Sequence, residues 1–262
     1  MDSEQTYDPF ARYYDLDFGD HVEDIPLYRE MIRRTGAPIL ELMCGTGRVL
    51  VPLAEDGYAL TGVDVSAAML NIARQRLAAA SIAQQVTLVQ ADVRTVELPA
   101  RHFALAFVAI NSFMHLETIN DQLAALKTIR HALQPDGLLI LDLFNPDPFQ
   151  IHQEDNRLVL VREFDLDGRH VYKFVAQESD LATQTNQVTY FYDEVDPAGQ
   201  VTRRVMRFRM RWLYRYELEH VLARAGFRLR AVYGSYDLDE YTSDSPRMIA
   251  FAAPLKDRNR GI

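Results

Sequence analysis

The chain has 262 residues, a hydrophobic content of 48% and a formal net charge of −9. This length fits one domain with an elaboration or with a small second domain, and the composition is that of an ordinary globular protein. The acidic balance argues against general binding to nucleic acid or to an anionic membrane. The longest apolar runs are too short to span a membrane, and the first five residues lack the features of a signal peptide. Cys44 is the single cysteine, which excludes an intramolecular disulfide and favours a cytoplasmic location.

The first 36 residues predict a helical cover with two helix-like segments between residues 7 and 35. The first of these segments is rich in aromatic residues, namely Tyr7, Phe10, Tyr13 and Tyr14. From Pro38 onward the pattern alternates between apolar strands and amphipathic helices. Strands are expected at 38–43, 58–63, 86–90, 103–109 and 137–143, and helices at 47–56, 66–80 and 119–133.

This alternation predicts a parallel sheet that is covered by helices on both faces. Ser66 is well placed to cap the helix that follows it. The run 134–137 (Gln-Pro-Asp-Gly) is expected to end a helix and to form a turn before the next strand.

The pattern changes after residue 148. Residues 157–212 alternate with a strand period and contain turn-like Asp-Leu-Asp-Gly and Asp-Pro-Ala-Gly runs at 165–168 and 196–199, which predicts an antiparallel meander. A helix at 214–225 and strands at 227–233 and 247–253 then resume the α/β pattern. We therefore expect an α/β domain made of residues 37–150 and 214–255, with residues 151–213 inserted as an antiparallel β lid.

The most informative segment is the apolar run Ile-Leu-Glu-Leu-Met at 39–43, which leads into a Gly-x-Gly turn at 45–47. Polar residues follow the next three predicted strands, at Asp64, Asp92 and Asn111. The carboxyl ends of parallel strands line one crevice, so these side chains are expected to meet there. The turn is not a dinucleotide fingerprint, because Leu50 stands where the third glycine is required. Leu50 therefore disfavours a dehydrogenase. The turn also lacks the lysine of a phosphate-binding loop.

With this segment and the strand ends that follow it, the sequence resembles the class I S-adenosylmethionine-dependent methyltransferases. The resemblance covers residues 37–145 and 214–253. The family motif Asp/Glu-x-Gly-x-Gly-x-Gly corresponds here to residues 41–47, with Met43 in place of the first glycine. The resemblance implies a doubly wound, mostly parallel seven-stranded sheet, a Rossmann-like methyltransferase fold, and S-adenosyl-L-methionine as cofactor. The layout is similar to that of small-molecule N-methyltransferases, including those that act on aminosugars.

The resemblance also assigns cofactor contacts. Gly45 and Gly47 would border the methionine moiety, Asp64 would bind the ribose hydroxyls, and Asp92 would accept from the adenine amino group. Physical reasoning supports these roles, because a carboxylate can accept from both hydroxyls of a diol. The alternative is that Asp64 complements a helix N-terminus and Asp92 is a turn residue. The full set of expected cofactor contacts is Tyr14, Glu41, Gly45, Gly47, Asp64, Val65, Met69, Asp92, Val93 and Asn111.

Two residues are candidates for a catalytic role. His115 follows the fourth predicted strand and could deprotonate an amine or hold an acceptor hydroxyl, since its reference pKa lies near about 6.5. Tyr14 lies in an aromatic and acidic stretch that resembles the segment covering the cofactor in small-molecule N-methyltransferases. A structural histidine and a packing tyrosine are the alternative interpretations.

The segment 203–212 places Arg207, Arg209 and Arg211 on one face of a strand and apolar residues on the other. A solvated face is favoured for the arginines over an anion-binding wall or a subunit contact. No metal is expected, because no second carboxylate ends strand 103–109. The first choice of partner is a small-molecule amine acceptor. An O-methyltransferase and a non-catalytic cofactor-binding protein are the alternatives, and a homo-oligomer stays open.

Overall fold

The computed structural model describes residues 7–256, without the side chains of residues 150, 152 and 154. The strands are β1 (Ile39–Leu42), β2 (Leu60–Asp64), β3 (Val86–Gln90), β4 (Phe103–Val108), β5 (Leu133–Phe144), β6 (Leu158–Leu166), β7 (Arg169–Asp180), β8 (Thr185–Val195), β9 (Val201–Arg211), β10 (Phe227–Tyr233) and β11 (Arg247–Pro254). The helices are α2 (Ala11–Phe18), α3 (Ile25–Thr35), α4 (Leu50–Glu55), α5 (Ala67–Ala79), α6 (Ile119–Ala132), α7 (Pro148–Glu154) and α8 (Arg215–Arg224). Single 3-10 turns are η1 (Asp8–Phe10), η2 (Ala83–Gln85) and η3 (Ser112–His115).

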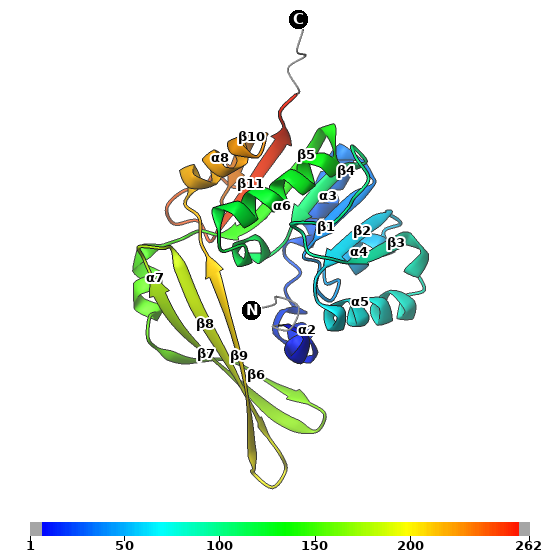
Figure 1. Cartoon of the computed structure of the whole chain (residues 1–262). Helices are drawn as coiled ribbons and strands as arrows, with labels where there is room; N and C mark the ends of the chain where they lie inside the picture. Colours follow the sequence, from blue (N-terminus) through cyan, green and yellow to red (C-terminus); the bar gives the residue numbers. More distant parts are fainter. Residues whose placement is uncertain (1–6, 257–262) are drawn as a thin grey trace, which may run out of the picture.

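A seven-stranded sheet in the order β10-β11-β5-β4-β1-β2-β3 forms the centre of the molecule (Figure 1). The strands from β1 to β5 run parallel, and β11 pairs antiparallel with both β5 and β10. Apolar side chains from one face of the sheet pack with those of α6 and α8, and those from the other face pack with α3, α4 and α5. The predicted doubly wound α/β sheet is confirmed.

Helix boundaries follow from capping and backbone conformation. The side chain of Ser66 accepts a hydrogen bond from Met69 N at 3.1 Å, so the expected cap begins α5. The helix predicted at 47–56 is shorter than expected and begins only at Leu50. Gly47 has a φ of +76°, which is incompatible with a right-handed helix and keeps this residue in the turn after β1.

The prediction of a turn at 134–137 is wrong, because β5 begins directly after α6, at Leu133, and includes these residues. In the pairing of β4 with β5, Phe103 lies opposite Leu133, but Leu105, two residues later, lies opposite Leu138. Residues 134–137 therefore protrude as an irregularity within the strand. The proline and glycine break the ladder locally, as their residue types suggest, without separating the helix from the strand.

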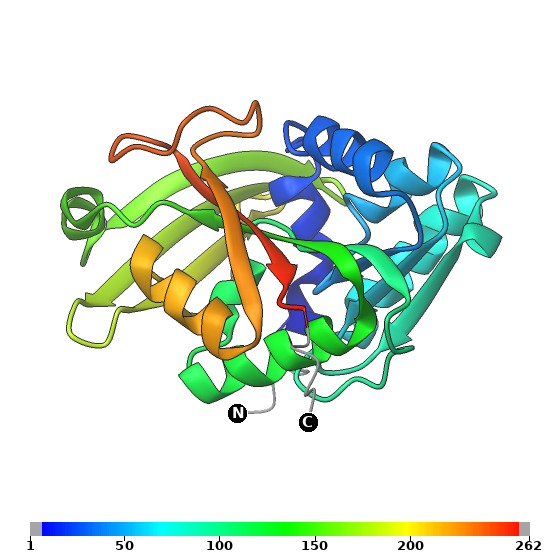
Figure 2. The ribbon, with the colours of Figure 1, turned by 90° about the horizontal axis from the view of Figure 1, so that it is seen from above.

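A second sheet, with strands in the order β6-β7-β8-β9, is formed entirely by residues between β5 and α8. All of its neighbouring strands are antiparallel, which confirms the predicted meander. Helix α7, which precedes it, was not predicted. Figures 1 and 2 both show α2 lying between this sheet and the parallel part of the main sheet. Among residues 7–256, no helix is both long enough and apolar enough to cross a membrane.

A buried ion pair fixes the turn after β1 to the segment that precedes α3. Arg48 Nη2 lies 2.6 Å from Asp24 Oδ2 and Arg48 Nη1 lies 2.8 Å from Asp24 Oδ1, and both side chains are buried. This two-pronged contact joins the N-terminal helices to the glycine turn. A charge left alone at such a site is costly, because the protein interior solvates it poorly.

We expect Asp24→Asn to lower the free energy of unfolding by about 3–5 kcal/mol, because it leaves Arg48 buried without a counter-charge. Urea denaturation followed by circular dichroism measures this loss. Arg29→Met is the control, since its pair with Asp56 is about 40% exposed on the arginine side and such pairs contribute only about 0–1 kcal/mol. Equal stability of the two variants would show that the buried pair does not anchor the fold.

Candidate active site

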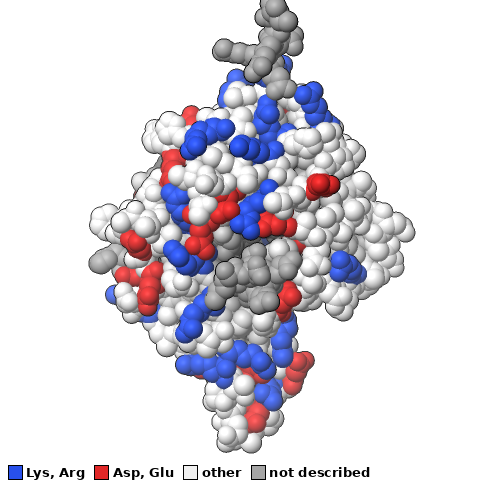
Figure 3. Space-filling model, viewed as in Figure 1, with Lys and Arg blue, Asp and Glu red and all other residues white. Residues whose placement is uncertain are grey.

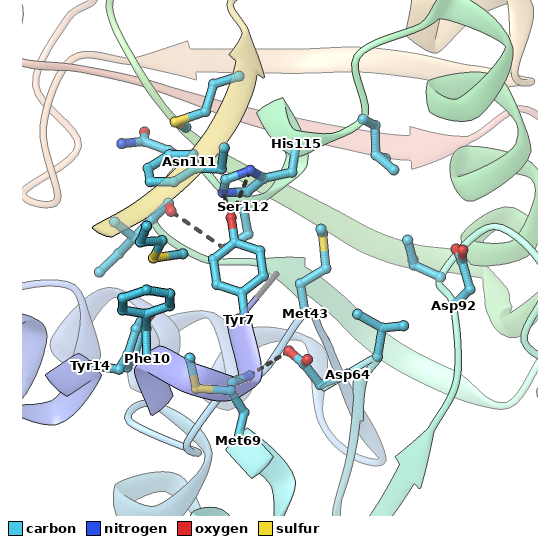
Figure 4. Close-up of a pocket in the computed structure, with 18 of the residues that line it drawn as sticks. Tyr7, Phe10, Tyr14, Met43, Asp64, Met69, Asp92, Asn111, Ser112 and His115 are labelled. Atoms are coloured by element: carbon cyan, nitrogen blue, oxygen red, sulfur yellow. Dashed lines mark hydrogen bonds between the residues drawn. The ribbon is translucent and has the colours of Figure 1, made fainter. Parts of the chain in front are cut away.

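A cavity of about 780 Å³ lies at the carboxyl ends of β1, β2, β3 and β4, and α2, β8 and β9 close its other side (Figure 4). The sheet side contributes polar groups together with apolar contacts, and the opposite side contributes mainly aromatic and methionine side chains. On the sheet side the lining includes Met43, Gly45, Asp64, Val65, Met69, Asp92, Val93, Asn111 and His115. On the opposite side it includes Tyr7, Phe10, Tyr14, Asp17, Phe18, Tyr190, Tyr192, Met206, Phe208 and Met210.

The turn after β1 is held to the end of β2 by Asp64. Its Oδ2 accepts from Gly45 N at 2.8 Å, and its Oδ1 accepts from Ser66 N at 2.9 Å. Gly45 has a φ of +54°, and a Cβ added there would lie 3.8 Å from Cε1 of Tyr14. Each Asp64 oxygen keeps acceptor capacity beyond these bonds. The carboxylate, the open glycine and the neighbouring ring thus fit a nucleoside with a short polar tail.

Burial raises the pKa of Asp64, and the backbone N–H donors of Ser66 and Gly45 act in the opposite direction. The pKa of Tyr14 rises to about 12, chiefly through burial. Tyr14 therefore stays protonated at neutral pH and presents a hydroxyl donor to the cavity.

Asp92 lies at the other end of the same wall, after β3. Its Oδ1 accepts from Arg94 N at 2.8 Å and from Arg94 Nε at 2.9 Å, while Arg94 Nη1 donates to Asp121 Oδ1 at 2.8 Å. The hydrogen bond from the Arg94 side chain lowers the pKa of Asp92. Asp92 is consequently ionised and held by a single arginine at the rim of the cavity.

Tyr7 and His115 meet inside the cavity, where Figure 4 shows the Tyr7 ring between Asp64 and His115. The Tyr7 hydroxyl lies 3.0 Å from each ring nitrogen of His115. Burial lowers the pKa of His115 to about 4, against a hydrogen bond with the backbone of Arg209. His115 is therefore neutral at neutral pH and is a weak base there.

Asn111 lies in the left-handed conformation, with a φ of +59°, and donates its backbone N–H to Asp142 O at 2.8 Å. Asp142 is buried and accepts from Ile110 N, Tyr236 Oη and Arg247 Nε at 2.9–3.1 Å. Asp142 therefore fixes the loop after β4. Within residues 7–256, no group of three or more His, Cys, Asp or Glu side chains is arranged to hold a metal ion.

Two of the predicted cofactor contacts do not line the cavity. Glu41 is buried within β1, and its Oε2 has no hydrogen-bond partner among the described residues. Burial raises the pKa of Glu41 well above its usual value. Gly47 packs against α4 and α5, since a Cβ there would lie 3.4 Å from both Val51 Cγ2 and Ala73 Cβ. The remaining predicted contacts and His115 are brought together in one cavity.

Strand β9 presents its apolar face to the cavity, through Met206, Phe208 and Met210, and turns its arginines away. Arg209 Nε lies 3.4 Å from Glu117 Oε2, and Arg211 Nη2 lies 2.6 Å from Glu217 Oε1. Arg209 and Arg211 are therefore paired with carboxylates, and Arg207, Arg209 and Arg211 do not line this cavity.

The expectations from the sequence did not include Asp17 or the apolar face of β9 as parts of the lining, and for Tyr190 and Tyr192 they left strand packing and contact with the acceptor as alternatives. A signal for Asp17 exists in the sequence, because Phe10, Tyr14 and Asp17 are spaced by four and three residues. Such spacing places them on one side of a helix. The position of Tyr192 depends on how the second sheet docks on α2, which the strand pattern does not specify.

Residues 39–137 match the family model of the methyltransferase domain. The putative methyltransferase YqeM of Bacillus subtilis (strain 168) is 26% identical over 224 residues, which cover 83% of this chain and 84% of that protein. The solved structure of the CcbJ methyltransferase from Streptomyces caelestis matches with a TM-score of 0.80 and 24% identity, over 97% of this chain and 99% of that one.

A further solved structure, that of S-adenosylmethionine-bound CalS10, an amino pentose methyltransferase from Micromonospora echinaspora, matches with a TM-score of 0.71 and 22% identity. The match covers 96% of this chain and 97% of that chain. These likenesses agree with the seven-stranded sheet. The chain therefore carries a methyltransferase domain over residues 39–137 and acts as an S-adenosylmethionine-dependent methyltransferase, with S-adenosylmethionine as its cofactor.

Proposed function

We propose that the enzyme methylates a small molecule at an amine nitrogen. The observation that carries this proposal is the division of the cavity into a polar half on the sheet and an aromatic half on α2, β8 and β9. A concave site with an aromatic wall suits an organic acceptor of limited size better than a polymer. The amino pentose methyltransferase CalS10, which has the same fold, supports an amine.

The polar half would hold the cofactor. Gly45 and Asp64 would contact its aminoacyl and ribose parts, and Asp92 and Val93 would lie at its adenine. Bound there, the cofactor supplies an electrophilic methyl group. The chain's own residues bind, orient and exclude water, and positioning of this kind is worth up to about 7–11 kcal/mol in well-oriented systems.

Residues 1–36 and 151–213 would act as a cover and a lid over residues 37–150 and 214–255. Residues 1–6 of this cover lie outside the described part of the chain. Contacts between α2 and the second sheet support the assignment, since Tyr13 Oη donates to Glu194 and Lys173 Nζ donates to Asp17 Oδ2 at 2.8 Å. The two segments would therefore close the cavity as one unit.

The visible surface gives little support to a polyanionic partner. On the face shown in Figure 3, basic and acidic side chains are interspersed. On the second sheet, Arg203 Nε lies 2.6 Å from Asp193 Oδ1 and Arg204 Nε lies 3.3 Å from Glu194 Oε1. A small acceptor without nucleic acid or membrane is the simplest partner. A cytoplasmic location stays a prediction from the single cysteine.

Matched pairs of acceptors test the proposal. The full-length enzyme is incubated with methyl-labelled cofactor and with glucosamine or glucose, benzylamine or benzyl alcohol, and aniline or phenol. Mass spectrometry then locates any label. We expect label on amine nitrogen only. Label confined to the hydroxyl compounds would establish O-methylation, and S-adenosylhomocysteine binding without transfer to any acceptor would favour a non-catalytic binding protein.

His115→Asn should slow turnover on the best amine by about tenfold or more, because the shorter side chain no longer reaches the Tyr7 hydroxyl. Since the pKa of His115 is about 4, the kcat of the wild type should not change with pH around the usual histidine pKa of about 6.5. Stopped-time assays from pH 5.5 to 9 measure both. A wild-type rate in the variant would show that His115 does not contribute to turnover, and a histidine titration near pH 6.5 would contradict the lowered pKa of His115.

Asp64→Ala should weaken binding of S-adenosylhomocysteine by at least about tenfold, because both a ligand acceptor and the anchor of the glycine turn are lost. Isothermal titration calorimetry measures the affinity. Asp56→Ala, in an exposed pair on the same half of the molecule, is the control and should bind normally. Unchanged affinity in Asp64→Ala would mean that the cofactor lies elsewhere.

A further inference from the structure

Asp17 is a buried carboxylate, and only one of its two oxygens accepts hydrogen bonds from described residues. Its Oδ2 accepts from Lys173 Nζ at 2.8 Å and from the Tyr192 hydroxyl. Its Oδ1 is buried without a hydrogen-bond partner among the described residues, although the side chain is only 2% exposed. Asp17 also lines the cavity, on its aromatic half.

The cation beside Asp17 is itself enclosed. Lys173 is 5% exposed, and its Nζ lies 3.8 Å from the ring centroid of Tyr190 and 5.3 Å from that of Phe18. Burial lowers the pKa of Lys173, while the charge of Asp17 and its hydrogen bond raise it. The protein's own ammonium group thus lies against the face of the Tyr190 ring.

The other titratable groups near this pair come from three elements. Tyr14 lies on α2 itself, Tyr190 and Tyr192 come from β8, and burial raises the pKa of each of these tyrosines. Arg162 of β6 donates to Asp17 O at 2.7 Å and to Asp20 Oδ2 at 2.6 Å. Tyrosines with raised pKa values are neutral at neutral pH, and Asp20 balances Arg162. Asp17 and Lys173 therefore form a pair without net charge at the wall of the cavity.

A buried acceptor without a donor is unfavourable, and a ligand that donates a hydrogen bond to it removes this cost. A cationic ligand would bring a second positive charge close to Lys173, which is unfavourable where water is excluded. A neutral N–H donor has no such penalty. The geometry therefore discriminates between the two protonation states of an amine.

We propose that Asp17, held by Lys173 and Tyr192, binds the methyl acceptor by accepting a hydrogen bond from the N–H of its neutral amine. This inference rests on the proposed function and specifies which form of the amine the enzyme takes. A neutral amine keeps its lone pair, and a carboxylate oxygen engages its hydrogen and leaves that pair free. The pair thus selects the nucleophilic form and rejects the ammonium ion.

Two small probes test this without turnover. Aniline is a neutral N–H donor at pH 7.5, and benzyltrimethylammonium is a permanent cation without an N–H. Their affinities for the S-adenosylhomocysteine-loaded enzyme are measured by calorimetry for the wild type, Asp17→Asn, Lys173→Met and the control Asp20→Asn. Affinity for S-adenosylhomocysteine and the thermal melting curve report on folding.

We expect the wild type to bind aniline in preference to the cation. Asp17→Asn should lose about tenfold in aniline affinity, because Lys173 and Tyr192 retain the amide oxygen and turn the amide NH₂ toward the cavity. Lys173→Met should gain about tenfold for benzyltrimethylammonium, because it leaves an uncompensated carboxylate among aromatic rings. Asp20→Asn should match the wild type.

Three results would overturn the inference: preference of the wild type for the cation, absence of aniline binding, or unchanged aniline affinity in Asp17→Asn. If Lys173→Met does not fold, the Asp17→Asn result alone decides. Failure of the proposed function alone would give a different result. The aniline affinity would still fall in Asp17→Asn, but no amine would receive label from the cofactor. With the best amine of the acceptor panel, Asp17→Asn should raise KM while leaving affinity for S-adenosylhomocysteine intact.

Discussion

The site depends above all on one carboxylate that ties two neighbouring strands together. Asp64 accepts backbone N–H groups from the turn after β1 and from the start of α5, at 2.8 and 2.9 Å. These bonds hold the glycine turn in a conformation that only a residue without Cβ adopts at low cost. The same carboxylate faces the cavity, so the group that shapes the turn is also the group offered to the ligand.

The second half of the cavity is organised differently, because its parts come from segments far apart in the sequence. α2 lies between the two sheets, and the second sheet contacts it through buried polar bonds, Lys173 to Asp17 and Tyr13 to Glu194. Buried polar groups tolerate few alternative arrangements, since an unpaired partner is costly. They therefore specify how the second sheet docks more narrowly than apolar contacts alone would.

Much of the fold could be predicted from sequence, because its signals are local. Alternating apolar strands and helices indicated the parallel sheet, and turn residues indicated the antiparallel insertion. The position of Gly47 in the turn shortened α4, and the irregular pairing of residues 134–137 depends on β4, which lies elsewhere in the chain. Gly45, Asp64 and Asp92 were predictable because strand ends share an edge. Glu41 and Gly47 were harder to place, since packing against neighbouring elements, which the motif does not encode, keeps both out of the cavity. Lys173 carries no local signal, and for Tyr192 the strand pattern left packing and contact with the acceptor as alternatives.

The docking of α2 against the inserted sheet has a consequence for how such enzymes diversify. One wall of the cavity belongs to the main sheet, whereas the opposite wall belongs to a helix and an insertion that bind each other. Strands β8 and β9 make no contact with the turn that Asp64 holds in the hydrogen bonds described above, so changes there reshape one wall without altering the other. A scaffold divided in this way lets the two walls of one cavity vary independently.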